Sequence, residues 1–259
     1  MSKVIVITGA SEGIGAELAR QLGKLGHKLV LAARTESKLK EVADNIDAET
    51  LIVPTDVTKR ADVDNLRDRA IEKFGHVDVW VNNAGRGITR PVLELNEQDL
   101  DDMWDINVKS VMFGVWSIVP HMRERKAGQI INVSSFLGRV PVASPRSVYS
   151  ACKAAVNSLT ANLRNDLRGS GVNVTLIIPG MVATAFHANT KHVPEAGARP
   201  GAMPSPPPGM QIQSAEEVAG VIANTIAEPV PEVYTNPAHA PVAAKYYENV
   251  AAFEAQMGA

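Results

Sequence analysis

A chain of 259 residues with 45% hydrophobic and 21% charged residues is typical of a water-soluble globular protein, and its length suits one α/β domain over residues 1–259. A net charge of −2 gives no reason to expect nucleic acid or an anionic membrane surface as a partner. The single cysteine, Cys152, excludes a disulfide within the chain and fits a reducing compartment. We see neither a signal-peptide pattern nor an apolar segment long enough to span a bilayer, so we expect a cytoplasmic protein.

Short apolar segments alternate along the chain with longer segments of helical periodicity. Near-continuous runs of β-branched residues are typical of strands that are buried on both faces of a parallel sheet. Six such strands and a weaker seventh are expected at residues 4–8, 28–33, 50–56, 77–85, 128–135, 172–180 and 231–237. Between strands, as over residues 155–167, apolar residues recur on one helical face. This alternation predicts a doubly wound α/β fold, a Rossmann-type parallel sheet of about seven strands with helices on both faces.

One segment interrupts this alternation. Residues 192–213 contain six prolines and show no clear periodicity. Long irregular segments in compact domains are commonly binding loops, lids or mobile surface loops. Ligands of such sheets bind at the carboxyl ends of the strands. We therefore favour a substrate lid over residues 185–213, with a mobile surface loop as the alternative.

The first expected strand runs directly into a glycine-rich turn, TGASEGIG, over residues 8–15. Glycine permits positive φ and lets the backbone approach a diphosphate closely. The free N–H groups and the dipole of the following helix then face the phosphates. A tight turn with no ligand is the alternative, but the strand before it and the amphipathic AELARQLGKLG after it favour a nucleotide cradle.

Tyr149 and Lys153 lie four residues apart in SVYSACK, so in a helix their side chains share one face. A cation beside a phenol lowers the pKa of the phenol and brings it closer to working pH, where general acid–base catalysis is most effective. The alternative is a chance contact on a helix surface, and the pair alone does not decide between the two.

Further motifs follow in order along the chain. Besides the glycine turn and YSACK, they are Asp56 after the third strand, NNAG at residues 82–85, Asn107 in INV, Ser134 and Ser135 in INVSS, and PGMVAT at residues 179–184. In this order and with this spacing, the chain resembles the short-chain dehydrogenase/reductase family, in its type of roughly 250 residues. The resemblance is strong over about residues 3–185 and loose beyond them.

The resemblance implies hydride transfer between a nicotinamide cofactor and the carbonyl carbon of a ketone or aldehyde, or in reverse from a secondary alcohol. It implies that Tyr149 is the general acid/base, that Lys153 also bonds the nicotinamide ribose, that Ser135 orients the carbonyl and that Asn107 holds a water linking Lys153 to solvent. Ser135 is preferred over Ser134 because side chains alternate along a strand and FLG follows Ser135. The interval from Ser135 to Tyr149 is one residue longer than the family pattern, an insertion that a loop tolerates.

The resemblance also implies the cofactor contacts. They are Gly9, Ser11, Glu12, Gly13, Ile14, Gly15, Arg34, Asp56, Val57, Asn83, Ala84, Gly85, Tyr149, Lys153, Pro179, Gly180, Val182 and Thr184. Asp56 would face the adenine amino group, and Val57 would add its backbone N–H. The Val182 backbone and Thr184 would hold the carboxamide.

The end of the second strand favours NADP(H), with NAD(H) possible. An acidic residue there usually accepts a hydrogen bond from a free ribose 2′-hydroxyl, and Ala33 cannot. Arg34 offers donors that match a 2′-phosphate. Two features point the other way: Glu12 stands where many NADP-dependent relatives have a basic residue, and Arg34 could instead stack on the adenine.

Two other function classes are less well supported. The length and the Thr-Gly-x-x-x-Gly-x-Gly spacing argue against a nicotinamide-dependent epimerase or dehydratase. The intact set of Asn107, Ser135, Tyr149 and Lys153 argues against a non-catalytic nucleotide-binding module. No recognisable pattern identifies the substrate beyond a small carbonyl compound or alcohol.

Three further expectations concern metals, charges and assembly. No metal site is expected, since the spacing of His187 and His192 fits no familiar zinc pattern. The charge cluster at residues 99–102, which contains three aspartates, is interpreted as a solvated helix start. The family resemblance, with apolar helices around residues 107–119 and 151–167, predicts a homo-oligomer, a tetramer above other states.

Overall fold

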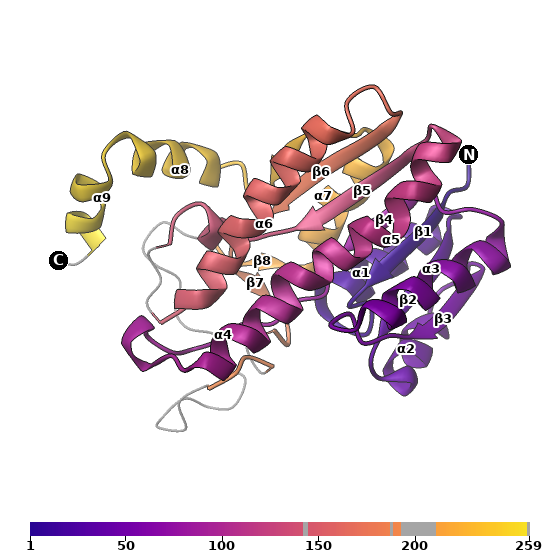
Figure 1. Ribbon diagram of the computed structural model, residues 1–259, viewed down its shortest axis with the longest axis horizontal. Helices are drawn as coiled ribbons and strands as arrows, with labels where there is room; N and C mark the ends of the chain where they lie inside the picture. The colour runs from indigo at the N-terminus through magenta and orange to yellow at the C-terminus, as the bar shows by residue number, and fades with distance from the viewer. Residues whose placement is uncertain (142–144, 187–188, 193–210, 258–259) are drawn as a thin grey trace.

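Seven parallel strands form the central sheet of the computed structural model, which describes residues 1–141, 145–186, 189–192 and 211–257 (Figure 1). The strand order is β3-β2-β1-β4-β5-β6-β9. The strands are β1 (Val4–Thr8), β2 (Lys28–Ala33), β3 (Thr50–Pro54), β4 (Val79–Asn82), β5 (Gly128–Val133), β6 (Val172–Ile178) and β9 (Glu232–Tyr234). The order reverses between β1 and β4, so the prediction of a doubly wound Rossmann-type sheet is confirmed.

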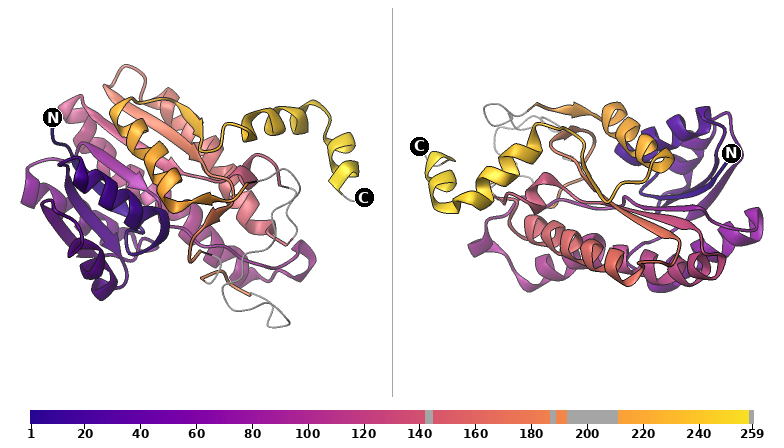
Figure 2. Two further views of the ribbon diagram at one scale, coloured as in Figure 1. Left: turned by 180° about the vertical axis from the view of Figure 1, so that it is seen from behind. Right: turned by 90° about the horizontal axis from the view of Figure 1, so that it is seen from above.

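Helices cover both faces of the sheet, which explains why the strands are almost continuously apolar. Every residue of β1 and β4 is buried. One face is covered by α1 (Gly13–Lys24), α2 (Glu36–Ala43) and α7 (Ala215–Ala227), whose apolar residues join one core cluster. The opposite face is covered by α3 (Arg60–Phe74), α5 (Ser110–Arg125) and α6 (Ser147–Asp166). The view from above in Figure 2 shows α1 and α7 on one side of the sheet and α5 and α6 on the other.

The remaining elements lie at the carboxyl edge or beyond the sheet. They are α4 (Glu97–Trp104), a π-helical turn η2 (Asp105–Lys109), the 3-10 turns η1 (Val92–Glu94) and η3 (Phe136–Gly138), the short strands β7 (Val182–Ala183) and β8 (Gln213–Ser214), α8 (His239–Glu248) and α9 (Val250–Met257). Helices α8 and α9 extend away from the sheet as an arm (Figure 1). Among the described residues, no helix combines the length and apolarity needed to cross a bilayer.

Four of the six strands with strong patterns end two or three residues earlier than the sequence indicates, and the weaker seventh also ends three residues early, at Tyr234. The expected ends were residues 56, 85, 135 and 180, and the observed ends are Pro54, Asn82, Val133 and Ile178. The cause is visible at β4. Its neighbour β1 already ends at Thr8, so the Asn83 N–H donates to the Thr8 hydroxyl (3.0 Å) and not to a backbone carbonyl of β1. The polar and glycine residues that follow these four strands are therefore loop residues.

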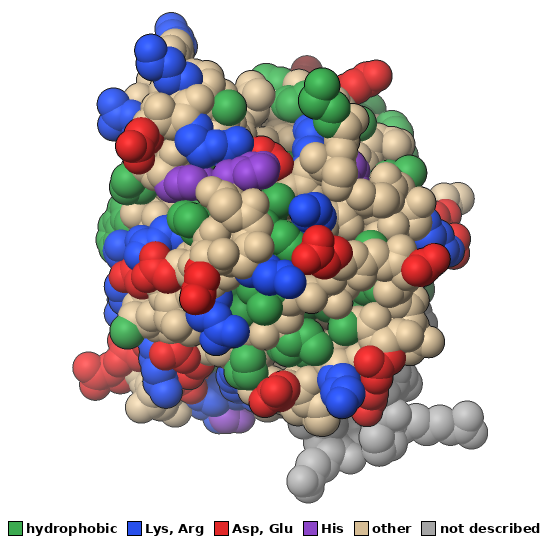
Figure 3. Space-filling model, turned by 90° about the vertical axis from the view of Figure 1, so that its right-hand side faces the viewer, with side chains coloured by type: hydrophobic (Ala, Val, Ile, Leu, Met, Phe, Trp, Pro, Cys, Tyr) green, Lys and Arg blue, Asp and Glu red, His purple; other side chains and the backbone are tan. Residues whose placement is uncertain are grey.

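Charges of both signs are mixed on the face near β3 and α3 (Figure 3). Basic side chains there pair with acidic ones, as Arg60 does with Asp64 (2.9 Å) and Lys73 with Glu49 (3.2 Å). This interspersed pattern agrees with the net charge of −2.

Candidate active site

The residues predicted to bind a cofactor or to catalyse gather at the carboxyl edge of the sheet. The loops after β1, β4, β5 and β6 bring the glycine turn, residues 83–85, the two serines and the turn at residues 179–180 to this edge. The reversal of strand order lies between β1 and β4, and crevices at such points are where ligands bind in open α/β sheets.

The glycine turn leaves no room for side chains at two of its positions. Gly9 has φ +67°, and a Cβ added there would lie 2.9 Å from the Cα of Ala84. A Cβ on Gly15 would lie 2.3 Å from the Gly9 carbonyl oxygen. Helix α1 begins at Gly13, so its free N–H groups face the space in front of the turn. The turn therefore has the shape and the donors that a diphosphate requires.

Residues 83–85 support this turn from the neighbouring strand. The Thr8 hydroxyl accepts hydrogen bonds from the backbone N–H groups of Asn83 (3.0 Å) and Ala84 (3.1 Å). The Asn83 side-chain amide donates to the Thr8 carbonyl (2.9 Å). The two loops are thus fixed against each other.

Beside the end of β2, a cavity of about 300 Å³ is lined by Arg34, Pro54, Thr55, Asp56 and Asp62. Burial acts to raise the pKa of Asp56, but hydrogen bonds from Thr58 and the charges of Lys59 and Arg34 outweigh it and lower that pKa. A charged Asp56 beside Arg34 thus lines a space at the place expected for the adenosine.

The other predicted contacts around the glycine turn differ in how they can act. Glu12, the N-cap residue of α1, pairs with Lys38 (3.2 Å) and accepts a hydrogen bond from Asn189. The side chain of Ile14 packs against the core, so Ile14 can offer a ligand only its backbone. Ser11 lies half-buried in the turn, and Val57 is buried.

Helix α6 begins at Ser147, so Tyr149 and Lys153 lie in its first two turns, on one face and both buried. The Lys153 ammonium donates to the Val133 carbonyl (3.0 Å) and lies 5.6 Å from the centre of the Tyr149 ring. A Cβ on Gly85 would lie 2.9 Å from Asn107 Oδ1 and 3.5 Å from Lys153 Nζ, so these two polar groups flank the same point.

Asn107 is held rigidly inside the π-helical turn η2. Its side-chain amide donates to the carbonyls of Arg86 (3.0 Å) and Met103 (3.0 Å), and its Oδ1 accepts from the Arg86 N–H (3.2 Å). Such turns are frequent at functional sites because they displace one side chain from the regular helical pattern. These backbone contacts hold the Asn107 side chain in place next to Lys153.

The two serines after β5 face different ways. Ser134 donates to the Lys153 carbonyl (3.2 Å) and to Asn157, and so binds α6 in place. The Ser135 hydroxyl accepts from the Leu137 N–H (3.2 Å) and lies close enough to the Tyr149 phenol to lower its pKa. The structure therefore brings Ser135, and not Ser134, next to the phenol.

Burial dominates the ionisation of the Tyr149–Lys153 pair. It raises the pKa of Tyr149 to about 12, against the hydrogen bond from Ser135 and the charge of Arg146, while Cys152 adds to the rise. Burial also lowers the pKa of Lys153 to about 8, with Cys152 opposing. The net shift in the pKa of the phenol is therefore upward and not the lowering expected beside Lys153, because burial is the largest effect on it. The ammonium lies over the ring and bonds Val133, and desolvation outweighs its charge.

The loop after β6 lies between the glycine turn and α8. The Pro179 carbonyl accepts a hydrogen bond from the Phe136 N–H (2.7 Å), and a Cβ on Gly180 would lie 2.1 Å from Cε1 of His239. Val182 begins β7, and the Thr184 side chain would touch a Cβ on Gly13 (3.3 Å). The loop thus reaches from the serines to the glycine turn, across the space expected for a nicotinamide.

Residues 3–194 match the family described as short chain dehydrogenase. The chain belongs to the short-chain dehydrogenase family. The resemblance stated from the motifs is thereby confirmed, over nearly the same residues.

Curated and solved relatives agree with this assignment. An uncharacterized oxidoreductase of Staphylococcus aureus is 39% identical over 187 residues, which is 72% of this chain and 80% of that protein. A short-chain dehydrogenase/reductase from Burkholderia phymatum, solved in complex with NAD, has a TM-score of 0.80 at 31% identity and covers 96% of this chain and 94% of its own. A metagenomic short-chain oxidoreductase solved with NADP has a TM-score of 0.71 at 29% identity, covering 90% and 95%.

The acidic residues at the start of α4 correct one expectation about this short-chain dehydrogenase. The helix start is right, because α4 begins after an Asn96 cap, but Asp99 is fully buried and not solvated. Its carboxylate pairs with Arg90 (2.6 Å), Lys191 (2.8 Å) and His192 (2.9 Å).

Most of the predicted lid over residues 185–213 lies outside the described residues, because residues 187–188 and 193–210 are not among them. In the parts of the chain that the structure describes, no group of His, Cys, Asp and Glu could hold a metal ion.

Sequence reasoning missed the roles of three residues in and around this site. Arg146 precedes Tyr149 by one helical turn, a spacing that could have drawn attention to it. Asn189 bonds Glu12 through its side chain and Arg86 (2.9 Å) through its carbonyl, so it bridges the glycine turn and the loop after β4. Asp99 could have been found from the Asn96-x-x-Asp99 capping box.

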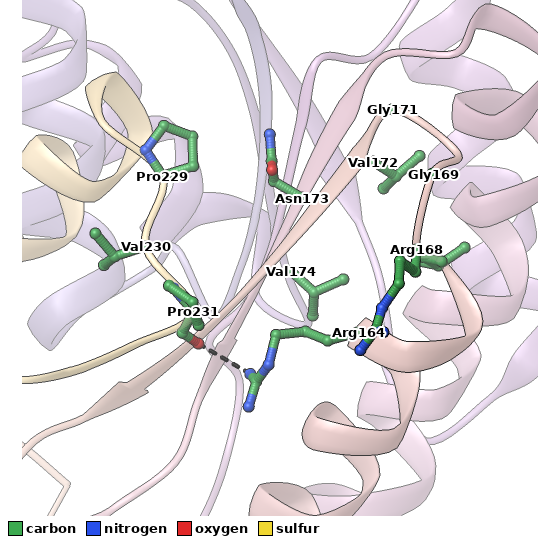
Figure 4. Close-up of a pocket in the computed structure, with 11 residues that line it drawn as sticks. Arg164, Arg168, Gly169, Gly171, Val172, Asn173, Val174, Pro229, Val230 and Pro231 are labelled. Atoms are coloured by element: carbon green, nitrogen blue, oxygen red, sulfur yellow. Dashed lines mark hydrogen bonds between the residues drawn. The ribbon is translucent and has the colours of Figure 1, made fainter.

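A larger cavity of about 450 Å³ lies at the other end of the sheet, where β6 and β9 begin (Figure 4). Arg164 and Arg168 line it, and Arg164 donates to the Pro231 carbonyl (2.9 Å). It contains none of the residues of the short-chain dehydrogenase motifs, and we do not assign the catalytic site to it.

Proposed function

We propose that this protein reduces a ketone or aldehyde carbonyl with a nicotinamide cofactor, or oxidises a secondary alcohol in the reverse direction. The observation that carries the proposal is the convergence of Tyr149, Ser135, Lys153 and Asn107 at the carboxyl edge of the sheet, beside the glycine turn. An acid/base, an oxygen-orienting donor and a buried cation at one point are what carbonyl reduction requires.

The chain's own groups would handle the oxygen and the proton. In reduction, the Tyr149 hydroxyl donates its proton to the carbonyl oxygen, while the Ser135 hydroxyl donates a hydrogen bond to the same oxygen as its negative charge grows. Lys153 places a cation next to the phenolate that remains, and Asn107 keeps the backbone beside Lys153 in place. A bound nicotinamide would supply the hydride in this direction and accept it in the other.

The residues present fit such a cofactor. The cradle at Gly9 and Gly15, which any Cβ would fill, suits the diphosphate, and the cavity beside Arg34 and Asp56 suits the adenosine. Solved relatives contain NAD in one case and NADP in another, so family membership supports a nicotinamide cofactor of either kind.

Within this proposal we favour NADP(H). Ala33 ends β2 without a side-chain acceptor for a ribose 2′-hydroxyl, and Arg34 lines the adjoining cavity. The carboxylate of Glu12, which argued against NADP(H), is paired with Lys38, and this pairing reduces its repulsion of a 2′-phosphate. The test is the ratio of kcat/KM for NADPH and NADH in wild type and in Ala33→Asp/Arg34→Ala. An NADH-preferring wild type, or an unchanged ratio in the double variant, would show that the discriminating contact lies elsewhere.

The function itself is tested by crossing a panel of ketones, aldehydes and secondary alcohols with both cofactors. We expect oxidation of NADPH with at least one carbonyl compound, and the matching alcohol to reduce NADP⁺. Cofactor binding without turnover of any compound would favour a non-catalytic nucleotide-binding module. Epimerised or dehydrated products without net cofactor consumption would favour the epimerase or dehydratase class.

A further inference from the structure

Arg146 is fixed at the start of α6, one turn before Tyr149. Its backbone forms a parallel bridge with Arg90, and the Ser147 hydroxyl donates to the Arg90 carbonyl (2.7 Å). The Arg146 carbonyl accepts hydrogen bonds from both the N–H and the hydroxyl of Ser150 (3.0 Å each). The backbone of Arg146 is therefore held on two sides, which restricts where its side chain can go.

The guanidinium of Arg146 is directed into the loops that surround the phenol. Its Nη1 donates to the Ile88 carbonyl (3.3 Å) and to the Thr190 hydroxyl (3.3 Å). Burial lowers the pKa of Arg146, and the nearby Tyr149 phenol acts in the opposite direction. A guanidinium nevertheless keeps its charge throughout the pH range in which proteins work.

The absence of a side chain at Gly87 shows how closely these groups approach one another. A Cβ there would lie 2.9 Å from each of three atoms, Arg146 Nη1, Phe186 Cε1 and Thr190 Oγ1. The Phe186 ring in turn lies 5.6 Å from the Tyr149 ring, centre to centre. The guanidinium, the Phe186 ring and the phenol therefore form adjoining parts of one wall.

Besides burial, three groups shift the pKa of the Tyr149 phenol, and Lys153 lies close to its ring. The hydrogen bond from Ser135 and the charge of Arg146 lower its pKa, and Cys152 raises it. Lys153 lies over the ring at 5.6 Å. Because burial lowers the pKa of Lys153 to about 8, its charge is lost at alkaline pH, where a phenolate forms most readily.

We propose that Arg146 is a positioning residue that acts through Tyr149, by placing a permanent positive charge beside the phenolate that the reaction uses. The inference rests on the proposed role of Tyr149 as acid/base. In alcohol oxidation the O–H proton passes to the Tyr149 oxygen while the C–H hydride passes to the nicotinamide. The phenolate is consumed in that step, and carbonyl reduction regenerates it. Arg146 stabilises the charged form in both directions.

The first test measures the phenol directly, without substrate or cofactor. Protein that carries tyrosine isotope-labelled at Cζ is titrated by NMR over the pH range in which circular dichroism shows it to be folded, and Tyr149→Phe identifies the resonance. We expect Arg146→Gln to move the Tyr149 titration to higher pH by at least about half a pH unit. Arg146→Lys should restore most of the wild-type behaviour. Even an incomplete titration ranks the variants, because the Cζ chemical shift of Tyr149 changes less at each pH in the variant whose Tyr149 pKa is higher.

Thr190→Val is the matched control, since it removes the same side-chain hydrogen bond as Arg146→Gln but keeps the charge. Its titration should coincide with that of wild type. An unchanged titration in Arg146→Gln, or an equal shift in Thr190→Val, would overturn the proposal. The second measurement is the pH profile of kcat/KM for cyclohexanol oxidation. This profile should move to higher pH in Arg146→Gln and stay close to that of wild type in Arg146→Lys and Thr190→Val. Absence of turnover with every alcohol would contradict the proposed function, whereas the titration alone decides the role of Arg146.

Discussion

At the scale of residues, burial shifts the pKa values of the phenol and of the amine in the directions that favour their neutral forms. The pKa of Tyr149 rises to about 12 and that of Lys153 falls to about 8. A neutral phenol is a competent proton donor for carbonyl reduction at neutral pH. The reverse reaction needs the phenolate and therefore depends on neighbouring charges and donors. This asymmetry predicts that oxidation rates rise more steeply with pH than reduction rates.

Tyr149→Phe removes the proton donor and leaves a ring of the same shape. We expect the fold and cofactor binding to persist and kcat to fall by about 10²–10⁴-fold, the range that a placed proton donor contributes. Turnover is measured by cofactor absorbance, and binding by calorimetry with NADPH. A variant that keeps a substantial share of wild-type turnover would exclude Tyr149 as the acid.

His239 predicts a pH dependence of stability. Its imidazole is 3% exposed and stacks on Phe136, and within the described part of the chain neither ring nitrogen has a hydrogen-bond partner. Burial lowers the pKa of His239 below its ordinary 6.5. Below about pH 6.5 the unfolded chain therefore binds a proton that the folded protein does not accept. The stability contributed by neutral His239 is complete above this pH and is lost as the pH falls.

We expect His239→Leu to reduce the loss of unfolding free energy between about pH 6.5 and 5, measured by urea denaturation. The comparison above about pH 7.5 reports the packing effect of the substitution separately, because the imidazole is then neutral in both states. His27 and His121, whose pKa values are also lowered by burial, should retain part of the slope. If unfolding free energy falls with pH equally in the variant and in wild type, the assignment of this pH dependence to His239 is refuted.

At the scale of elements, the buried carboxylate of Asp99 joins α4 to two loops. Arg90 comes from the loop after β4, and Lys191 and His192 follow β7. Removing one member of a buried ion pair leaves the partner charges uncompensated, so Asp99→Asn should cost about 3 kcal/mol of unfolding free energy. Asp102→Asn is the control, because the Asp102 carboxylate also pairs with Lys191 but is 42% exposed, and it should cost no more than about 1 kcal/mol.

Hydrogen exchange reports whether the loops separate locally in Asp99→Asn. The Thr89 N–H donates to the Lys191 carbonyl (2.9 Å), and the Lys191 N–H donates to the Gly87 carbonyl (3.0 Å). Both amides should exchange faster in Asp99→Asn than in Asp102→Asn. Equal protection in the two variants would mean that the backbone bridge holds without the buried charge.

Most of the sheet could be predicted from the sequence, because long buried strands leave a strong apolar pattern. The ends of strands could not, since they depend on where the neighbouring strand stops, as Asn83 beside Thr8 shows. The glycine turn and the Tyr149–Lys153 pair were found because both are local in sequence. Arg146 and Asp99 act through partners that are distant in sequence, such as Thr190 and Lys191, so a local pattern can single out the two residues but cannot show their contacts.

At the scale of the whole molecule, one face of the sheet presents large apolar side chains to solvent. Trp104 on α4, Trp116 on α5 and Leu159 on α6 are 42%, 51% and 37% exposed, and all three helices lie on the same side. The arm formed by α8 and α9 adds Tyr247, which is 61% exposed (Figure 1). Exposed apolar side chains gathered on one face commonly mark subunit interfaces, and a tetramer with paired two-fold axes needs two such surfaces.

We therefore expect a homo-oligomer, with light scattering at micromolar concentration giving a mass about four times that of one chain. Trp116→Glu/Leu159→Glu places two carboxylates on the α5–α6 face and should reduce the mass to that of a smaller assembly or a monomer. Leu25→Glu is the matched control, because Leu25 is 63% exposed but follows α1 on the opposite side of the sheet, and its mass should equal that of wild type. A monomeric wild type would contradict the prediction. A tetramer that survives the double substitution would move the interface away from α5 and α6, to the α8–α9 arm or to the α1–α7 side.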